Sequence, residues 1–364
     1  MGALLSKWTK GMRPGSLPRA AVLFTAILLF LSVGCEGRSY TRYRREFYDL
    51  FDTATIVIVY AERERDFEKY YGAIFDEMQR LNRLYDIYND YDGISNIKTI
   101  NDNAGLSPVT VDPSIIDLLR EAKLACERTG GLANAAMGSV LRIWHDYRGR
   151  GISKPEAAEL PPMSLLDDAS LHTDMDGVEI DEELNTVFLR DPKMSLDVGA
   201  FAKGYAVQLA VEKAKAAGMT SGLISAGGNV AAVGKPMDGR DKWSVGIRNP
   251  DALADGDSSL FDTVEVNDMS AVTSGDYERF YVVDGVSYSH IIDPATKMPA
   301  RLYKSVTVIH PDSGRADMLS TALFILPQAE GEALAGEFGA EALWILPDNS
   351  AVMTSGYRAI SSLD

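Results

Sequence analysis

The chain has 364 residues, 46% of them hydrophobic and 24% charged, which is ordinary globular composition and fits one large domain or two small ones. Its formal net charge of -16 would repel a nucleic-acid backbone, so we expect no DNA or RNA partner. The two cysteines provide neither a disulfide framework nor a cysteine-rich metal site.

The N-terminus is typical of an exported lipoprotein. Lysines and arginines precede a short apolar run, and small residues then lead to Cys35. This order predicts a signal peptide over residues 1–34, and the run is shorter than the ~20 residues that a transmembrane helix needs. We expect lipid on Cys35, a polar tether over 35–46 and one folded domain over 47–364, anchored in the periplasm or on the outer face of the cell membrane. A plain signal peptide or an uncleaved anchor is the alternative.

Apolar residues recur with helical and strand periods along the rest of the chain. The helical period predicts helices at residues 65–84, 113–128, 200–217 and 316–326. The two-residue period predicts strands at residues 54–60, 186–190, 221–225, 229–233, 243–247, 305–310, 342–346 and 351–357. Residues 149–195, rich in Pro, Asp and Gly, are expected to lie mostly at the surface.

One hairpin signal is strong. Asp284–Gly285 separates the apolar alternations 280–283 and 286–291, which is typical of a two-residue hairpin turn. Strands and helices mix without regular βαβ alternation. The expected fold class is therefore α+β, with mainly antiparallel strands and packed helices.

Two helices could carry phosphate and metal chemistry. Asp197 and Lys203 flank the start of the helix at 200–217, where free backbone N–H groups and a lysine suit an anionic phosphate. Asp317 and Thr321 are four residues apart on the last helix, so a carboxylate and a hydroxyl share one face, as a Mg²⁺ site with phosphate ligands requires. A capped helix with a solvated lysine, and an Asp that merely favours the helix dipole, are the alternatives.

Two further segments carry polar groups of use to a reaction. His290 ends a predicted hairpin strand beside a proline turn, where an ionisable imidazole can act as a base. Tyr88 lies in a tyrosine-rich turn that could present an aromatic face to a planar ligand. A structural role is open for both. The sequence has no GxGxxG, GxxxxGK[ST], HExxH or GxSxG signature.

Taken together and in this order, these segments resemble the ApbE family of FAD:protein FMN transferases, from about Leu50 to Leu326. The matching runs are LYDIYNDYDGISNIKTIN, SLDVGAFAKGYAV, SAGGNVAAVG, WSVGIRNP, TSGDYERF, YSHIIDPAT and RADMLSTALF. The resemblance implies a T-fold-like catalytic domain that uses Mg²⁺ and transfers FMN from FAD to a Thr or Ser hydroxyl of a target protein, with release of AMP. It also implies that the target is an exported membrane electron-transport subunit.

The resemblance further implies site residues. The metal ligands would be the Ala200 carbonyl and the side chains of Asp317 and Thr321. Asp197, Lys203, Tyr88 and the backbone of Ile291 would contact FAD, and His290 is the candidate base.

One run departs from the family pattern. GGLANAAMG has Asn134 and Ala136 where the family usually has an Asp and a Thr. Asn134 is still expected to contact FAD. The loss of a charge and a hydroxyl leaves open the balance between transfer and hydrolysis. An FAD pyrophosphatase and a non-catalytic FAD-binding lipoprotein are therefore the rival functions.

Overall fold

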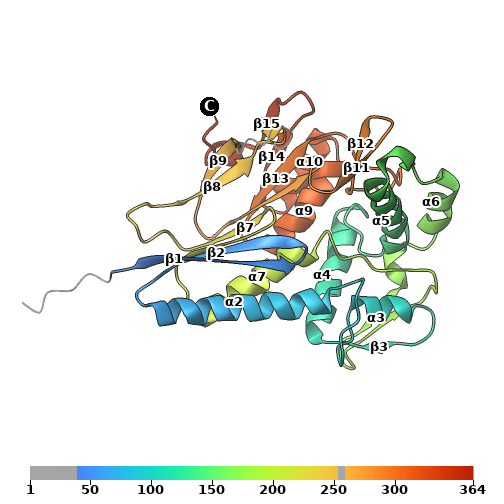
Figure 1. Ribbon diagram of the computed structural model, residues 1–364, viewed down its shortest axis with the longest axis horizontal. Coiled ribbons are helices and arrows are strands. Elements are labelled where there is room, and N and C mark those ends of the chain that lie inside the picture. The colour runs from blue at the N-terminus through green and yellow to red at the C-terminus, as the bar shows by residue number, and fades with distance from the viewer. Residues whose placement is uncertain (1–38, 253–258, 364) are drawn as a thin grey trace, which may run out of the picture. The chain divides into compact units, whose positions relative to one another are not determined.

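An eight-stranded antiparallel sheet is the largest element of the fold (Figure 1). The computed structural model describes residues 39–252 and 259–363, and the chain from Thr41 onward forms one unit. The sheet has the order β1-β2-β6-β7-β10-β13-β14-β15. Its strands are β1 Thr41–Leu50, β2 Thr53–Ala61, β6 Gly222–Ala226, β7 Asn229–Val233, β10 Ser270–Gly275, β13 Ser305–His310, β14 Glu341–Ile345 and β15 Ala351–Met353. The predicted α+β class is confirmed.

Helices α2 (Glu64–Leu84), α7 (Ala202–Ala216) and α9 (Ser313–Ile325) pack in a row against this sheet (Figure 1). α7 lies between the other two, and α10 (Gln328–Glu337) packs on α9. The apolar stripe of α2 explains its place, because its buried side chains recur at helical spacing. β13, in the middle of the sheet, is buried along its whole length. All four predicted helices are present, with ends shifted by three residues at most.

The smaller elements lie around the C-terminal end of α2 and beside the sheet (Figure 1). The helices are α3 Ile97–Asp102, α4 Pro113–Arg128, α5 Gly138–Ser153, α6 Met163–Ser170 and α11 Ser355–Arg358, with 3-10 turns at Pro155–Ala157 and Met175–Gly177. The strands are β3 Val109–Thr110, β4 Val178–Asp181 and β5 Thr186–Leu189 in one small sheet, the pair β8 Trp243–Arg248 and β9 Leu260–Val266, and the hairpin β11 Phe280–Val283 and β12 Val286–Ser289.

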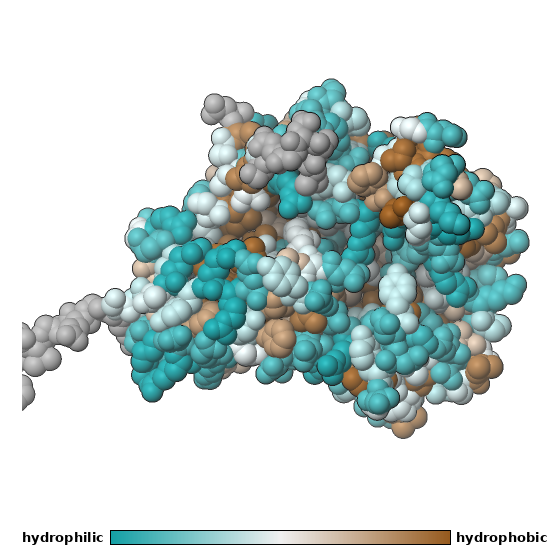
Figure 2. Space-filling view, in the orientation of Figure 1, coloured by the Kyte–Doolittle hydropathy of each residue, from teal (hydrophilic) through white to brown (hydrophobic). Residues whose placement is uncertain are grey.

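The β11–β12 hairpin is the surface on which α5 packs. Its turn is the predicted one, with positive φ at both Asp284 and Gly285. The ring of Trp144 lies 6.5 Å from that of Tyr281, and a Cβ at Gly151 would lie 2.6 Å from the same ring. Apolar side chains gather on the α5 and α6 side of the visible face (Figure 2). The close approach at Gly151 fixes α5 against the hairpin.

Two expectations from the sequence are wrong, and a third is confirmed. Residues 41–46 are not part of a tether, because they pair with β2 as the edge strand β1. The segment 149–195 is mostly exposed, as expected, although it also holds the end of α5, all of α6 and a few buried residues such as Leu166. The expected strand at 351–357 stops at Met353, where Thr354 caps the short helix α11 by accepting the backbone N–H of Tyr357.

Nothing in the described residues tests the membrane anchor. None of the helices between residues 39 and 363 that the structure describes combines the length and apolarity needed to cross a bilayer. The predicted signal peptide and Cys35 lie outside the described residues.

Candidate active site

Asp317 is buried where α7 meets α9. Its carboxylate accepts the backbone N–H of Gly204 at 2.7 Å, which is one of the free donors of the first turn of α7. Burial raises the pKa of Asp317, and the nearby ammonium of Lys203 lowers it. The expected helix mouth is therefore present, but Asp317 already occupies one of its donors. A carboxylate offers about four lone-pair sites, so Asp317 keeps capacity for a cation.

Lys203 joins the start of α7 to the β6–β7 turn. Its Nζ donates to the carbonyl of Gly227 at 2.6 Å. Residue 227 has to be a glycine, because its φ is +46° and a Cβ there would lie 2.2 Å from Oγ1 of Thr53. The turn is thus pressed against β2, and Lys203 is held beside Asp317 rather than left in solvent.

The other two expected metal ligands lie on or next to the same two helices, α7 and α9. Thr321 follows Asp317 by one turn of α9, and Ala200 lies two residues before α7 begins. Asn229, at the start of β7, lies close enough to Asp317 to lower its pKa, although neither side-chain atom of Asn229 makes a hydrogen bond of normal geometry among the described residues. Among the described residues, no group of three or more His, Cys, Asp or Glu side chains is arranged so that it could hold a metal ion. A metal here would have a single carboxylate ligand.

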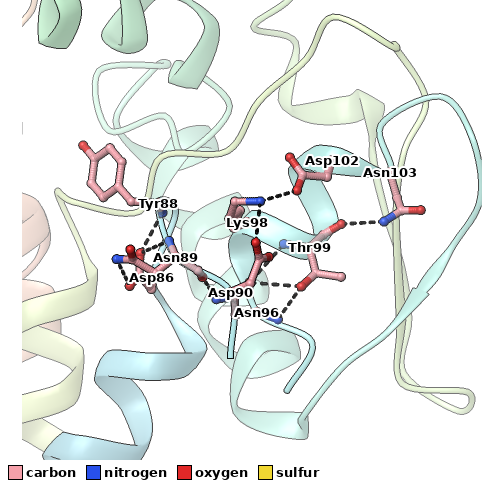
Figure 3. Close-up of polar contacts among 9 residues, drawn as sticks. All are labelled: Asp86, Tyr88, Asn89, Asp90, Asn96, Lys98, Thr99, Asp102 and Asn103. Carbon is pink, nitrogen blue, oxygen red and sulfur yellow. Dashed lines mark hydrogen bonds and ion pairs between the residues drawn. The ribbon is translucent and has the colours of Figure 1, made fainter. Parts of the chain in front are cut away.

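Tyr88 projects from a loop that is tied together by hydrogen bonds. The Asp86 carboxylate accepts the backbone N–H groups of Tyr88 and Asn89 and the hydroxyl of Tyr91. Asn96 caps α3 in a reciprocal arrangement with Thr99. Figure 3 shows the ring of Tyr88 pointing away from these contacts. The loop therefore fixes the backbone of Tyr88 and directs its ring away from the loop.

The hydroxyl of Tyr88 lies 2.9 Å from Nδ1 of His145 on α5. Nε2 of that histidine lies 3.9 Å from the carboxylate of Asp197. The surroundings of the hydroxyl, chiefly its burial, raise the pKa of Tyr88 to about 12, although 61% of the whole residue is exposed. Tyr88, His145 and Asp197 thus form a polar chain from the loop to the segment before α7. His145 was not among the residues that we predicted.

Asp197 is held in place from both sides. Its side chain accepts the backbone N–H of Gly199 at 2.9 Å, and its own backbone N–H donates to the carbonyl of Ala135 at 2.8 Å. Asn134 supports the same segment, because its oxygen accepts the N–H of Ala136 and its amide donates to the carbonyl of Thr173. Asn134 therefore shapes the wall next to Asp197, and both of its side-chain atoms are engaged in doing so.

His290 follows β12 directly and is shielded on Nδ1, which has no hydrogen-bond partner among the described residues. Burial, and after it the charges of Arg279, Arg148 and Lys203, lower the pKa of His290 to about 3. The next residue, Ile291, is buried and its carbonyl accepts the N–H of Ala300 at 2.9 Å. His290 is therefore a neutral imidazole in a cationic environment.

The structure brings the expected side chains to one region. Lys203 is close enough to act electrostatically on both Asp317 and His290, and Asp197 acts on Tyr88. The sequence interpretation missed Arg148 and Arg279, which act on Tyr88 and His290 alike. The site holds Lys203, Arg148 and Arg279 as cations, which suits a pyrophosphate.

Comparison with known proteins identifies the family. The ApbE family model matches residues 51–344. An FAD:protein FMN transferase of Treponema pallidum is 33% identical over 341 residues, covering 91% of this chain and 92% of that protein. One from Klebsiella pneumoniae is 32% identical, covering 77% of this chain and 84% of that protein.

Solved structures show the same fold. The ApbE protein of Thermotoga maritima has a TM-score of 0.75 at 28% identity, covering 88% of this chain and 99% of that one. The flavin transferase ApbE of Vibrio cholerae has a TM-score of 0.73 at 23% identity, which shows the fold alone. The fold and the relatives define a class of flavin-transferring enzymes. The chain belongs to the ApbE family.

Proposed function

We infer that this chain is an FAD:protein FMN transferase. The observation that carries this inference is the junction of α7 and α9, where a buried carboxylate on Asp317 and the ammonium of Lys203 share one site with the unpartnered imidazole of His290. The first two suit a metal-bound pyrophosphate, and the third suits an incoming hydroxyl. Family membership and curated relatives of that name point to the same activity.

The reaction follows from these groups. The oxygen of a Thr or Ser hydroxyl on the acceptor attacks the phosphorus of the FMN half of FAD, and a new P–O bond forms. The bond from that phosphorus to the bridging oxygen breaks, and AMP leaves with the electron pair. The hydroxyl proton passes to a base, for which His290 is our candidate because its lowered pKa keeps the imidazole neutral and its Nδ1 has no hydrogen-bond partner among the described residues.

A divalent metal fits the donors present. Asp317 is a buried carboxylate whose pKa is raised by burial, so a cation beside it would favour its ionised form. We propose Asp317, Thr321 and the Ala200 carbonyl as Mg²⁺ ligands, with substrate oxygens completing the shell. Bound Mg²⁺ would neutralise charge on the phosphates. Lys203 keeps the Gly227 turn in place beside it.

A product assay separates the rival functions. The purified protein is incubated with FAD and Mg²⁺, with and without an acceptor protein, and AMP and free FMN are followed by chromatography. A transferase releases AMP with the acceptor present and little free FMN. Equal amounts of AMP and free FMN, whether or not acceptor is added, would show a pyrophosphatase instead. Absence of AMP under both conditions would indicate a carrier.

The location remains a proposal that rests on the sequence. We propose that Cys35 carries lipid and that the acceptor is an exported subunit of a membrane electron-transport complex. Cys35→Ser should leave the protein unprocessed or release it from the membrane fraction. The intact mass of the protein extracted from membranes is the direct check. An unmodified Cys35 on the mature protein would contradict the proposal.

A further inference from the structure

Arg148 lies on the face of α5 that meets the β11–β12 hairpin. Trp144 and Gly151 both contact Tyr281 of that hairpin, and Arg148 lies between them at helical spacing. The guanidinium of Arg148 forms no ion pair or hydrogen bond with any described residue. In a chain with 52 acidic and 36 basic residues, a partly buried arginine without an ion pair is unusual.

Arg279 reaches the same place from the hairpin. Phe280 pairs with Ser289, and continuing this register by one residue sets Arg279 opposite His290. Its single ion pair among the described residues is with Asp52 at 3.4 Å, and the Asp52 side chain is 82% exposed. Such an exposed pair contributes little and can be exchanged for a ligand.

The two arginines are close enough to oppose each other's charge. Burial and Arg279 both lower the pKa of Arg148. Asp197 is close enough to raise the pKa of Arg148 but forms no ion pair with it among the described residues, so the two like charges stay incompletely compensated, at a cost that a bound anion would relieve. Both act on Tyr88, the expected flavin contact, and on His290, the candidate base.

We propose that Arg148 and Arg279 bind the phosphate of the FMN half of FAD. The identity of the dinucleotide in this inference rests on the proposed function. An in-line displacement places the attacking hydroxyl and the leaving AMP on opposite sides of the transferred phosphorus. Arg148 and Arg279 lie beside the base and the expected flavin contact. We therefore assign them to the transferred phosphate and not to the phosphate of AMP. A guanidinium suits this task because it donates in a planar fork.

Equilibrium binding tests the assignment without any transfer step. FMN, riboflavin and AMP are titrated separately into the wild-type protein, Arg148→Gln and Arg279→Gln. We expect Arg148→Gln to weaken FMN binding about tenfold or more, as expected for loss of a charge-assisted contact, with a smaller effect for Arg279→Gln. Riboflavin and AMP should bind as to wild type. Arg142→Gln is the matched control, because Arg142 is exposed on the same helix.

A lysine variant of Arg148 distinguishes the loss of a phosphate contact from a loss of folding. Arg148→Lys keeps the charge and should retain more FMN affinity than Arg148→Gln, with the same thermal midpoint. Unchanged FMN affinity in the Gln variants would overturn the proposal, and so would equal losses for FMN and riboflavin or for FMN and AMP. A protein that fails to label an acceptor but shows this FMN-specific loss would contradict the proposed function and leave the phosphate site standing.

Discussion

Gly204 donates its backbone N–H to the carboxylate of Asp317 at 2.7 Å, and this contact joins α7 to α9. The two backbones approach so closely that a Cβ at Gly204 would lie 2.4 Å from Cβ of Asp317 and 2.4 Å from the carbonyl oxygen of Ser313. The position of the expected metal ligand thus depends on a glycine in the neighbouring helix.

Gly204→Ala should displace Asp317. We expect a loss of about 1–3 kcal/mol in the free energy of unfolding from overpacking, together with a lower rate of FAD cleavage at limiting Mg²⁺. Denaturant unfolding and a Mg²⁺ titration of the cleavage rate measure both effects. Gly72→Ala on α2 is the control, because its Cβ would meet nothing within 4 Å. A Gly204→Ala protein as stable and as active as wild type would show that α9 can shift without consequence.

Asp317 and Thr321 should differ in their importance for the metal. Asp317→Ala removes the only charged ligand that we assign and should abolish Mg²⁺-dependent FAD cleavage. Thr321→Val removes a neutral oxygen and should mainly raise the Mg²⁺ concentration needed for half-maximal rate. AMP release over a range of Mg²⁺ concentrations measures this. Full activity of Asp317→Ala in excess EDTA would refute the metal assignment.

His290→Asn should separate binding from transfer. Lys203 and the start of α7 remain in place, so the affinity for FAD should change little. Loss of a positioned base should slow acceptor labelling about 10²–10⁴-fold. Flavin fluorescence gives the affinity, and single-turnover labelling gives the rate. Labelling at the wild-type rate would make His290 structural, and a parallel loss of affinity and rate would assign it to the pocket rather than to proton transfer.

Asp276 gives the folded protein a pH-dependent cost in stability. Burial raises the pKa of Asp276, Lys304 lowers it and Asp251 raises it, and together they bring it from 3.8 to about 6. At neutral pH the carboxylate is ionised both folded and unfolded, and the folded state bears the cost of the buried charge. As the pH falls through about 6, the folded state takes up the proton first, so this cost disappears by the ordinary value of 3.8.

Asp276→Asn should therefore raise the thermal midpoint by a few degrees at neutral pH and by little near the ordinary carboxyl pKa. Thermal unfolding of both proteins across this pH range is the measurement. Asp268→Asn, at an exposed carboxylate two residues before β10, is the control, because the asparagine oxygen can still accept the N–H of Gly234. A gap between Asp276→Asn and wild type that grows as the pH falls would contradict the sign of this effect.

The sequence predicts elements whose signals are local. Asp112 caps α4 and Pro113 begins it, and both ends of this helix agree with the prediction. The Asp284–Gly285 turn likewise specifies its hairpin. α5 escaped prediction because Gly149 and Gly151 lie within it and no side chain caps its start. β1 escaped because it is an edge strand in which charged residues alternate with few apolar ones.

The residues of the site likewise fall into those that the sequence predicts and those that it does not. The positions of Asp317, Thr321 and Lys203 on helices could be inferred from their spacing. The order of the sequence motifs then indicated that the three residues belong to one site. The roles of Arg148 and His145 could not, because a basic residue in a helix is normally a surface charge. Their importance arises from the packing of α5 on the hairpin, a contact between segments over a hundred residues apart that leaves no local signal.

The intact mass of an acceptor protein after incubation with the enzyme, FAD and Mg²⁺ tests the central claim most directly. We expect a gain equal to one FMN group, located by peptide mapping on a Thr or Ser hydroxyl, with one AMP released for each acceptor labelled. Asp317→Ala should leave the acceptor mass unchanged. AMP release with an acceptor that stays unmodified, across exported electron-transport subunits that carry such a hydroxyl, would contradict the transferase assignment.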